Sequence, residues 1–116
     1  RDAIDARYGE GTATLTVTDR YYNMIEKIRP HFHLVENARE ATRAAGLAPI
    51  VQPIRGGTDG ARLSYMGLPC PNLGTGGYGY HGPYEHITRE GMEAAVAVIR
   101  NLIRLYAGLG PDGASV

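Results

Sequence analysis

The sequence predicts an α/β fold in which strands and helices alternate along the chain. Three observations support this prediction: a strictly alternating segment near the start, two amphipathic helical patterns, and short apolar runs bounded by glycine and proline. The 116 residues are enough for one domain with a modest core that needs no disulfide or structural metal.

The first strand is predicted over residues 12–18, TATLTVT. Ala13, Leu15 and Val17 fall on one face and threonines fall on the other, a pattern typical of a half-buried strand in an antiparallel sheet. Shorter β-like runs follow at 49–54 and 70–75. The threonine-faced strand is expected to belong to a different sheet from these two.

Three helices are predicted between and after the strands. The first runs from about residue 30 to 45 and ends at Gly46, and the second is capped by Thr58 or Asp59 and continues through Tyr65. Thr88 caps the third helix, and the tail that follows Gly108 is expected to fray. The apolar stripe expected to be buried on the third helix is Met92, Ala95, Val96, Ile99, Leu102, Ile103 and Tyr106.

Composition argues against two classes of partner. The formal net charge is zero, with 12 basic and 12 acidic residues scattered along the chain, so no basic stripe is available for nucleic acid. No apolar run approaches the roughly 20 residues of a membrane span. The single cysteine, Cys70, lies between two prolines and excludes an internal disulfide. A soluble protein that binds neither nucleic acid nor membrane is therefore expected.

A glycine-rich loop at 74–84 contains the most informative histidine, His81. Gly74, Gly76 and Gly79 have dinucleotide-fingerprint spacing, but no helix is predicted to start there, which argues against nucleotide binding. From the residues alone, His81 is either a turn histidine or a single metal ligand in a site completed by distant residues. His31, His33 and His86 are expected at the surface.

Arg55 precedes two glycines and a predicted helix start. Its guanidinium and the free N–H groups of that helix are suited to one carboxylate, although a surface ion pair explains the arginine equally well.

Residues 54–88, IRGGTDGARLSYMGLPCPNLGTGGYGYHGPYEHIT, closely resemble the late segment of the peptidase T family of M20 metallopeptidases. Residues 18–28 and 89–105 also resemble that family, so the resemblance covers about 12–107. It implies that residues 1–26 are the end of an inserted α+β lid domain, with its last strand. Residues 27–116 would be the C-terminal part of the catalytic zinc-peptidase domain.

The resemblance also assigns roles to two residues. The family's last zinc ligand matches His81 in the run Gly76–Gly82, and the family's substrate-holding arginine matches Arg55. Other members of the clan carry an arginine one position before Arg62, so the role of Arg62 stays open. The other zinc ligands and the glutamate general base belong to the family's N-terminal half, and Glu85 and Glu90 are not assigned to that role.

The resemblance therefore implies the C-terminal portion of a cytoplasmic, zinc-dependent tripeptide aminopeptidase with two zinc ions. Its expected partners are short peptide substrates and the remaining N-terminal part of the enzyme, and homo-oligomer formation is left open. The isolated fragment is expected to be inactive, because one histidine cannot hold a two-metal centre. The alternative is a non-catalytic binding or assembly module that pairs through the edge of the threonine-faced strand.

Overall fold

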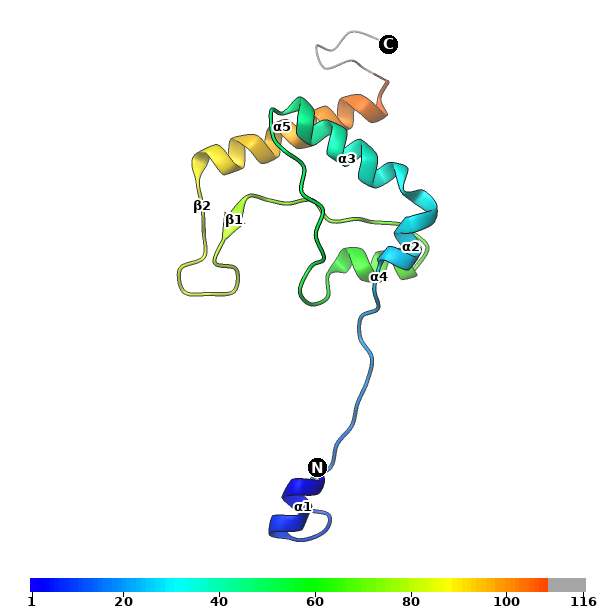
Figure 1. The fold of residues 1–116 in the computed structure, drawn as a ribbon, viewed down its shortest axis with the longest axis vertical. Coiled ribbons are helices and arrows are strands. Elements are labelled where there is room, and N and C mark those ends of the chain that lie inside the picture. Colours follow the sequence, from blue (N-terminus) through cyan, green and yellow to red (C-terminus); the bar gives the residue numbers. More distant parts are fainter. Residues whose placement is uncertain (109–116) are drawn as a thin grey trace.

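The computed structural model describes residues 1–108, whose regular secondary structure consists mainly of helices (Figure 1). The elements in chain order are α1 (Asp2–Tyr8), α2 (Ile25–Ile28), the 3-10 helix η1 (Arg29–His31), α3 (His33–Ala44), α4 (Asp59–Tyr65), β1 (Gly77–Tyr78), β2 (His86–Ile87) and α5 (Arg89–Tyr106). The predicted fraying of the tail concerns residues outside this described range. No helix within residues 1–108 is both long and apolar enough to cross a membrane.

The three predicted helices are confirmed, and their ends follow from local chemistry. Thr58 and Thr88 have extended backbones, and their hydroxyl oxygens accept the N–H groups of Ala61 and Gly91 at 3.2 and 3.0 Å. Each threonine thereby satisfies one of the donors that a helix start leaves without a partner. After α3, Gly46 adopts a positive φ of 77°, as expected of a glycine that ends a helix.

Helices α3 and α5 cross and pack against each other, and they form the main helical layer (Figure 1). Ala41 of α3 is completely buried, and the side-chain amide of Asn101 on α5 donates to its carbonyl oxygen at 3.3 Å. The small alanine lets the two helices approach closely enough for this hydrogen bond.

The predicted burial of the α5 stripe is wrong for most of its members within the described structure. Met92, Val96, Ile99, Ile103 and Tyr106 are between 48 % and 63 % exposed. Their spacing places them on one face of the helix, whereas α3 covers a different face, where Ala94, Ala97 and Val98 are half-buried. The helical period was therefore correct, but no described element covers this apolar face.

The three predicted strands are also wrong for the described residues. Segments 12–18, 49–54 and 70–75 are irregular, and Leu15, Val17 and Ile50 are 66 %, 80 % and 81 % exposed. A strand exists only when a neighbouring strand accepts and donates its backbone hydrogen bonds. The described residues provide no such neighbour, so the predicted α/β sheet is not formed, and β1 and β2 are the only paired strands there.

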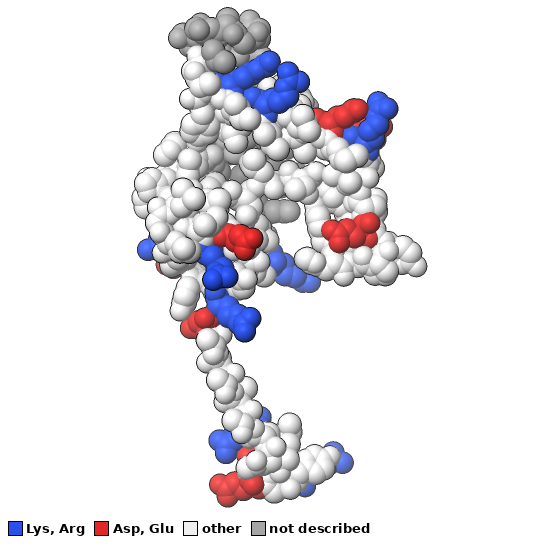
Figure 2. All heavy atoms as spheres, turned by 180° about the vertical axis from the view of Figure 1, so that it is seen from behind, with Lys and Arg blue, Asp and Glu red and all other residues white. Residues whose placement is uncertain are grey.

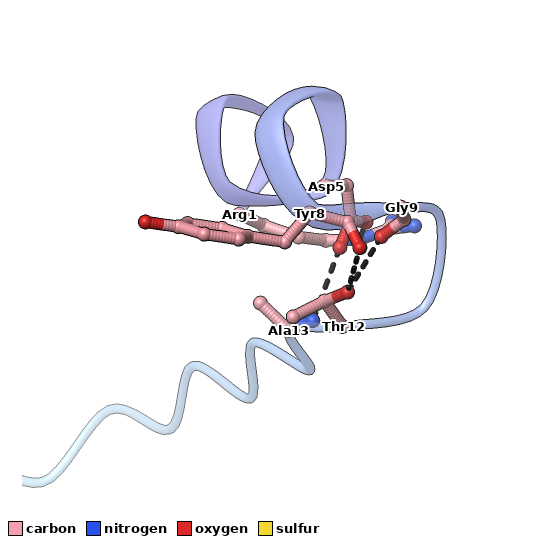
Figure 3. Close-up of polar contacts among 6 residues, drawn as sticks. All are labelled: Arg1, Asp5, Tyr8, Gly9, Thr12 and Ala13. Atoms are coloured by element: carbon pink, nitrogen blue, oxygen red, sulfur yellow. Dashed lines mark hydrogen bonds and ion pairs between the residues drawn. The ribbon is translucent and has the colours of Figure 1, made fainter.

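Helix α1 lies apart from the other helices, at the end of a long extended segment (Figure 1). It closes on itself through Asp5, whose carboxylate accepts the Ala13 backbone N–H at 3.0 Å and pairs with Arg1 at 3.1 Å (Figure 3). The Thr12 hydroxyl donates to the Gly9 carbonyl at 2.7 Å. These short-range bonds define α1 and its turn without any contribution from the helical layer.

Candidate metal-ligand and substrate-binding site

His81 lies in the loop of the β1–β2 hairpin. Tyr78 pairs with His86 in the antiparallel register, and their rings stack with centroids 5.4 Å apart and planes 19° apart. This pair closes the base of a loop formed by residues 79–85. A hairpin and not a helix follows these glycines, so the prediction that no helix starts there is confirmed.

The hairpin loop holds His81 in an uncommon backbone conformation. His81 has a φ of 62° and is the only non-glycine residue with a positive φ among residues 1–108. A turn from Gly79 to Gly82 (3.0 Å) and another from Gly82 to Glu85 (3.2 Å) fold the loop back on itself. The Glu85 carboxylate then accepts the backbone N–H of His81 at 3.1 Å.

The side chain of His81 is available to a ligand. The residue is exposed, and its ring forms no hydrogen bond to any described residue. An uncharged imidazole is a common zinc ligand, so its chemistry fits one position of a zinc site. No group of three or more histidine, cysteine, aspartate or glutamate side chains among the described residues is arranged to hold a metal ion. Further ligands would have to come from outside this part of the chain.

Arg55 is exposed at the start of a second loop, which leads into α4. Its guanidinium has no hydrogen-bond or ion-pair partner among residues 1–108. A side chain on Gly57 would overlap the ring of Tyr21, so glycine is required for this loop to lie against that ring. No hydrogen bond or ion pair in the described structure joins Arg55 to His81, and the two residues stand on separate loops.

The loop that follows α4 is fixed by two polar side chains. The Ser64 hydroxyl donates to the Gly60 carbonyl at 2.7 Å and accepts the Cys70 N–H at 2.9 Å. Asn72 donates to Thr58 Oγ1 at 3.1 Å. This network connects the Arg55 loop to the segment that leads to the hairpin.

The remaining sequence candidates lie away from the His81 loop tip or support the hairpin. Nδ1 of His86 bonds to the Tyr84 carbonyl at 2.7 Å, and His31 and His33 have ring centroids 6.3 Å apart in an edge-on arrangement. Arg62 borders a shallow cavity of ≈ 220 Å³ together with Arg20 and Tyr22.

The loop-closing contact of Glu85 was not predicted from the sequence. A carboxylate four residues after His81, across the Gly82-Pro83 turn, was the available signal. Glu85 also borders a shallow cavity of ≈ 300 Å³ together with Thr75, Tyr80 and His86.

The surface charges do not form a large patch of one sign on the face seen in Figure 2. Lysine and arginine side chains lie there in small groups interspersed with aspartate and glutamate. The two candidate residues are therefore one exposed imidazole and one exposed guanidinium on separate loops.

The sequence model of the peptidase family M20/M25/M40 matches residues 6–105. The chain belongs to this family. Its similar relatives include the peptidase T of Alkaliphilus oremlandii, 58 % identical over 106 residues, and the peptidase T of Halothermothrix orenii, also 58 % identical over 106 residues. Each match covers 91 % of this chain and 26 % of the relative. The peptidase T of Clostridium perfringens is 57 % identical over 104 residues, and this match covers 90 % of this chain and 26 % of the relative.

These comparisons confirm the resemblance to peptidase T within the M20 family. They also show that the chain spans about a quarter of the length of these relatives, 26 % in each case.

Proposed function

We propose that this chain is the C-terminal part of a zinc-dependent aminopeptidase that removes the N-terminal residue of tripeptides. The observation that carries the proposal is the exposed His81 imidazole, held in a positive-φ loop in a chain that belongs to the M20 family. Relatives named peptidase T, 57–58 % identical to it, support the assignment of peptidase activity to the complete protein.

His81 would supply one zinc ligand and Arg55 would bind a polar end of the substrate. Two bound zinc ions would supply Lewis-acid chemistry, polarising the scissile carbonyl and making a water molecule nucleophilic. The exposed guanidinium of Arg55 can pair with a peptide carboxylate through two parallel hydrogen bonds. Such an anchor favours short substrates, whose C-terminal carboxylate lies within reach of the site.

The proposal includes a division of the chain into two parts. Residues 1–26 would end a lid domain, and residues 27–116 would belong to the catalytic domain. The separation of α1 from the helical layer by an extended segment supports this division (Figure 1). We place the complete enzyme in the cytoplasm and expect the isolated chain to be inactive, because it holds one metal ligand of the several that a two-zinc centre needs.

The function is tested in the complete enzyme by comparing His81→Ala with His33→Ala, a surface histidine at the start of α3. His81→Ala should lower tripeptide hydrolysis by at least about 100-fold and reduce bound zinc, because a ligand is lost. His33→Ala should retain both properties. Full activity and full zinc content in the His81→Ala enzyme would contradict the proposal.

A second candidate function is an assembly module without catalytic activity. Segment 12–18 favours it, since Leu15 and Val17 are exposed and no strand pairs with this segment in the described structure. Sedimentation of the complete protein decides between the two. Assembly that Val17→Lys abolishes, together with no peptide cleavage, would favour the module.

A further inference from the structure

We infer that Glu85 is a positioning residue, which holds the backbone of His81 in the conformation that aims its imidazole at the metal. The inference rests on the proposed role of His81 as a zinc ligand. It concerns the hydrogen bond of 3.1 Å between the backbone N–H of His81 and Oε2 of Glu85.

The conformation of His81 needs support from outside the residue. In the left-handed region the Cβ atom of an L-residue crowds its own backbone, so non-glycine residues rarely adopt it. His81 nevertheless has a φ of 62°, where a glycine would be unstrained. Histidine therefore occupies a position whose backbone conformation costs free energy. An interaction that favours this conformation must offset part of that cost.

The Glu85 carboxylate provides this interaction because the loop brings it back over His81. The Glu85 backbone N–H donates to Gly82, and Gly82 donates to Gly79, so two successive turns reverse the chain. The Glu85 carboxylate then accepts the hydrogen bond from the His81 backbone N–H and so closes the loop. A charged acceptor makes a stronger bond than a neutral one. In the structure this bond accompanies the left-handed backbone conformation of His81.

The direction of the imidazole is coupled to this bond. Rotation of the His81 backbone out of the left-handed region changes the direction of the Cα–Cβ bond. It therefore moves the imidazole ring away from its present position. Residues that orient a metal ligand commonly alter metal affinity when they are removed. Glu85 touches neither substrate nor metal in this scheme and acts only through His81.

Four variants of the complete enzyme separate hydrogen-bond reach from charge. Glu85→Gln keeps an acceptor oxygen at the same distance and loses the charge, whereas Glu85→Asp keeps the charge and shortens the reach. Glu85→Ala removes both. Glu90→Ala is the matched control, because Glu90 is an exposed acid a few residues later with no recorded side-chain partner in the described structure.

Zinc affinity is measured by competition with a chromophoric chelator, and the thermal midpoint of each apo-protein is measured in parallel. We expect Glu85→Ala and Glu85→Asp to bind zinc about 10-fold more weakly, Glu85→Gln to stay within about 3-fold of the parent, and Glu90→Ala to be unchanged. Zinc affinity that decreases in the order parent, Glu85→Gln, Glu85→Asp, Glu85→Ala supports positioning by the hydrogen bond. If Glu85→Ala does not fold, the Gln and Asp variants carry the comparison.

Two outcomes overturn the inference, and a third result shows which proposal has failed. Parent-like affinity in Glu85→Ala removes any positioning role, and weak binding in Glu85→Gln with parent-like binding in Glu85→Asp shows that charge acts instead of the hydrogen bond. His81→Ala is measured beside them. If it loses zinc while all Glu85 variants bind normally, only this inference fails; if it binds zinc normally, the proposed function fails first.

Discussion

At the residue scale, Gly60 in α4 is a position where the backbone of another segment leaves no room for a side chain. It is buried, and a Cβ atom there would lie 2.6 Å from the Cys70 carbonyl oxygen and 2.8 Å from Asn72 Oδ1. These separations are far below ordinary carbon–oxygen contacts, and the Cys70 oxygen belongs to the backbone. The segment after α4 can therefore follow its path only because residue 60 has no side chain.

We predict that Gly60→Ala lowers the free energy of unfolding of the complete enzyme by about 1–3 kcal/mol, the usual cost of an overpacked site. The better helix propensity of alanine offsets part of the overpacking cost. Gly74→Ala is the control, because a Cβ atom at Gly74 meets nothing within 4 Å. Equal urea midpoints for the two variants would show that the loop relaxes without cost.

Tyr65 gives a prediction that depends on pH. Its hydroxyl lies 3.0 Å from Glu26 Oε2 and 3.1 Å from the Asn23 carbonyl oxygen, which joins α4 to α2. Desolvation, followed by the hydrogen bond to Glu26, raises the pKa of Tyr65 above its ordinary value of 10.0. The folded protein therefore binds this proton more tightly than the unfolded chain does.

The stabilisation from Tyr65 is complete below pH 10 and is lost as the pH rises through the raised pKa. We expect Tyr65→Phe to be less stable than the parent below pH 10, and the difference to shrink above it. Denaturant unfolding at pH 8 and at successive values above 10 measures this. A stability difference between Tyr65→Phe and the parent that grows above pH 10 would contradict this prediction.

At the element scale, the sequence predicted helices well and strands poorly, for a physical reason. The caps Thr58 and Thr88 bond to N–H groups three residues away, so their information is local. The strand at 12–18 needs a partner that the described residues do not contain, and its alternating pattern says nothing about where that partner is. For the site, the family motif is the basis on which His81 and Arg55 are proposed, whereas the Glu85 contact depends on a three-dimensional turn that the sequence pattern does not contain.

The exposed face of α5 also belongs to this scale. Met92, Val96, Ile99 and Ile103 form a continuous exposed apolar stripe on this helix. Burying each of these side chains would contribute about 1.5–3 kcal/mol. Since the match covers only 26 % of the relative's length, we expect other parts of the complete enzyme to cover the stripe.

We therefore predict that Ile99→Asp destabilises the complete enzyme by about 3 kcal/mol or more, because it places an unpaired charge on a face that we expect the rest of the enzyme to bury. Arg100→Gln, one position later and exposed, should change stability by less than about 0.5 kcal/mol. Denaturant midpoints of the two enzymes provide the comparison. A mild effect of Ile99→Asp would mean that the stripe faces solvent in the complete protein too.

At the scale of the whole molecule, the chain is far from compact. Its radius of gyration is 20.5 Å, whereas a compact domain of this length has one of about 13 Å. Its solvent-accessible surface area is 9317 Å², whereas a compact protein of the same mass has roughly 6,200 Å². The buried apolar residues in the described structure are Ile28, Ala41 and Ala61, which form a very small core.

So small a core cannot offset the conformational entropy of ordering the chain, which amounts to about 1–2 kcal/mol per residue for the backbone alone. We predict that the isolated 116-residue chain unfolds without a cooperative transition, binds the apolar dye ANS and does not cleave tripeptides. Adding the separately produced remainder of the enzyme should suppress dye binding and restore zinc-dependent cleavage, because the missing contacts are supplied in trans. The Ile99→Asp chain is the matched control and should not be rescued. A sharp unfolding transition of the isolated, monomeric chain would instead show that these residues form an independent domain, and the assembly-module function would then be the better explanation of its exposed apolar surfaces.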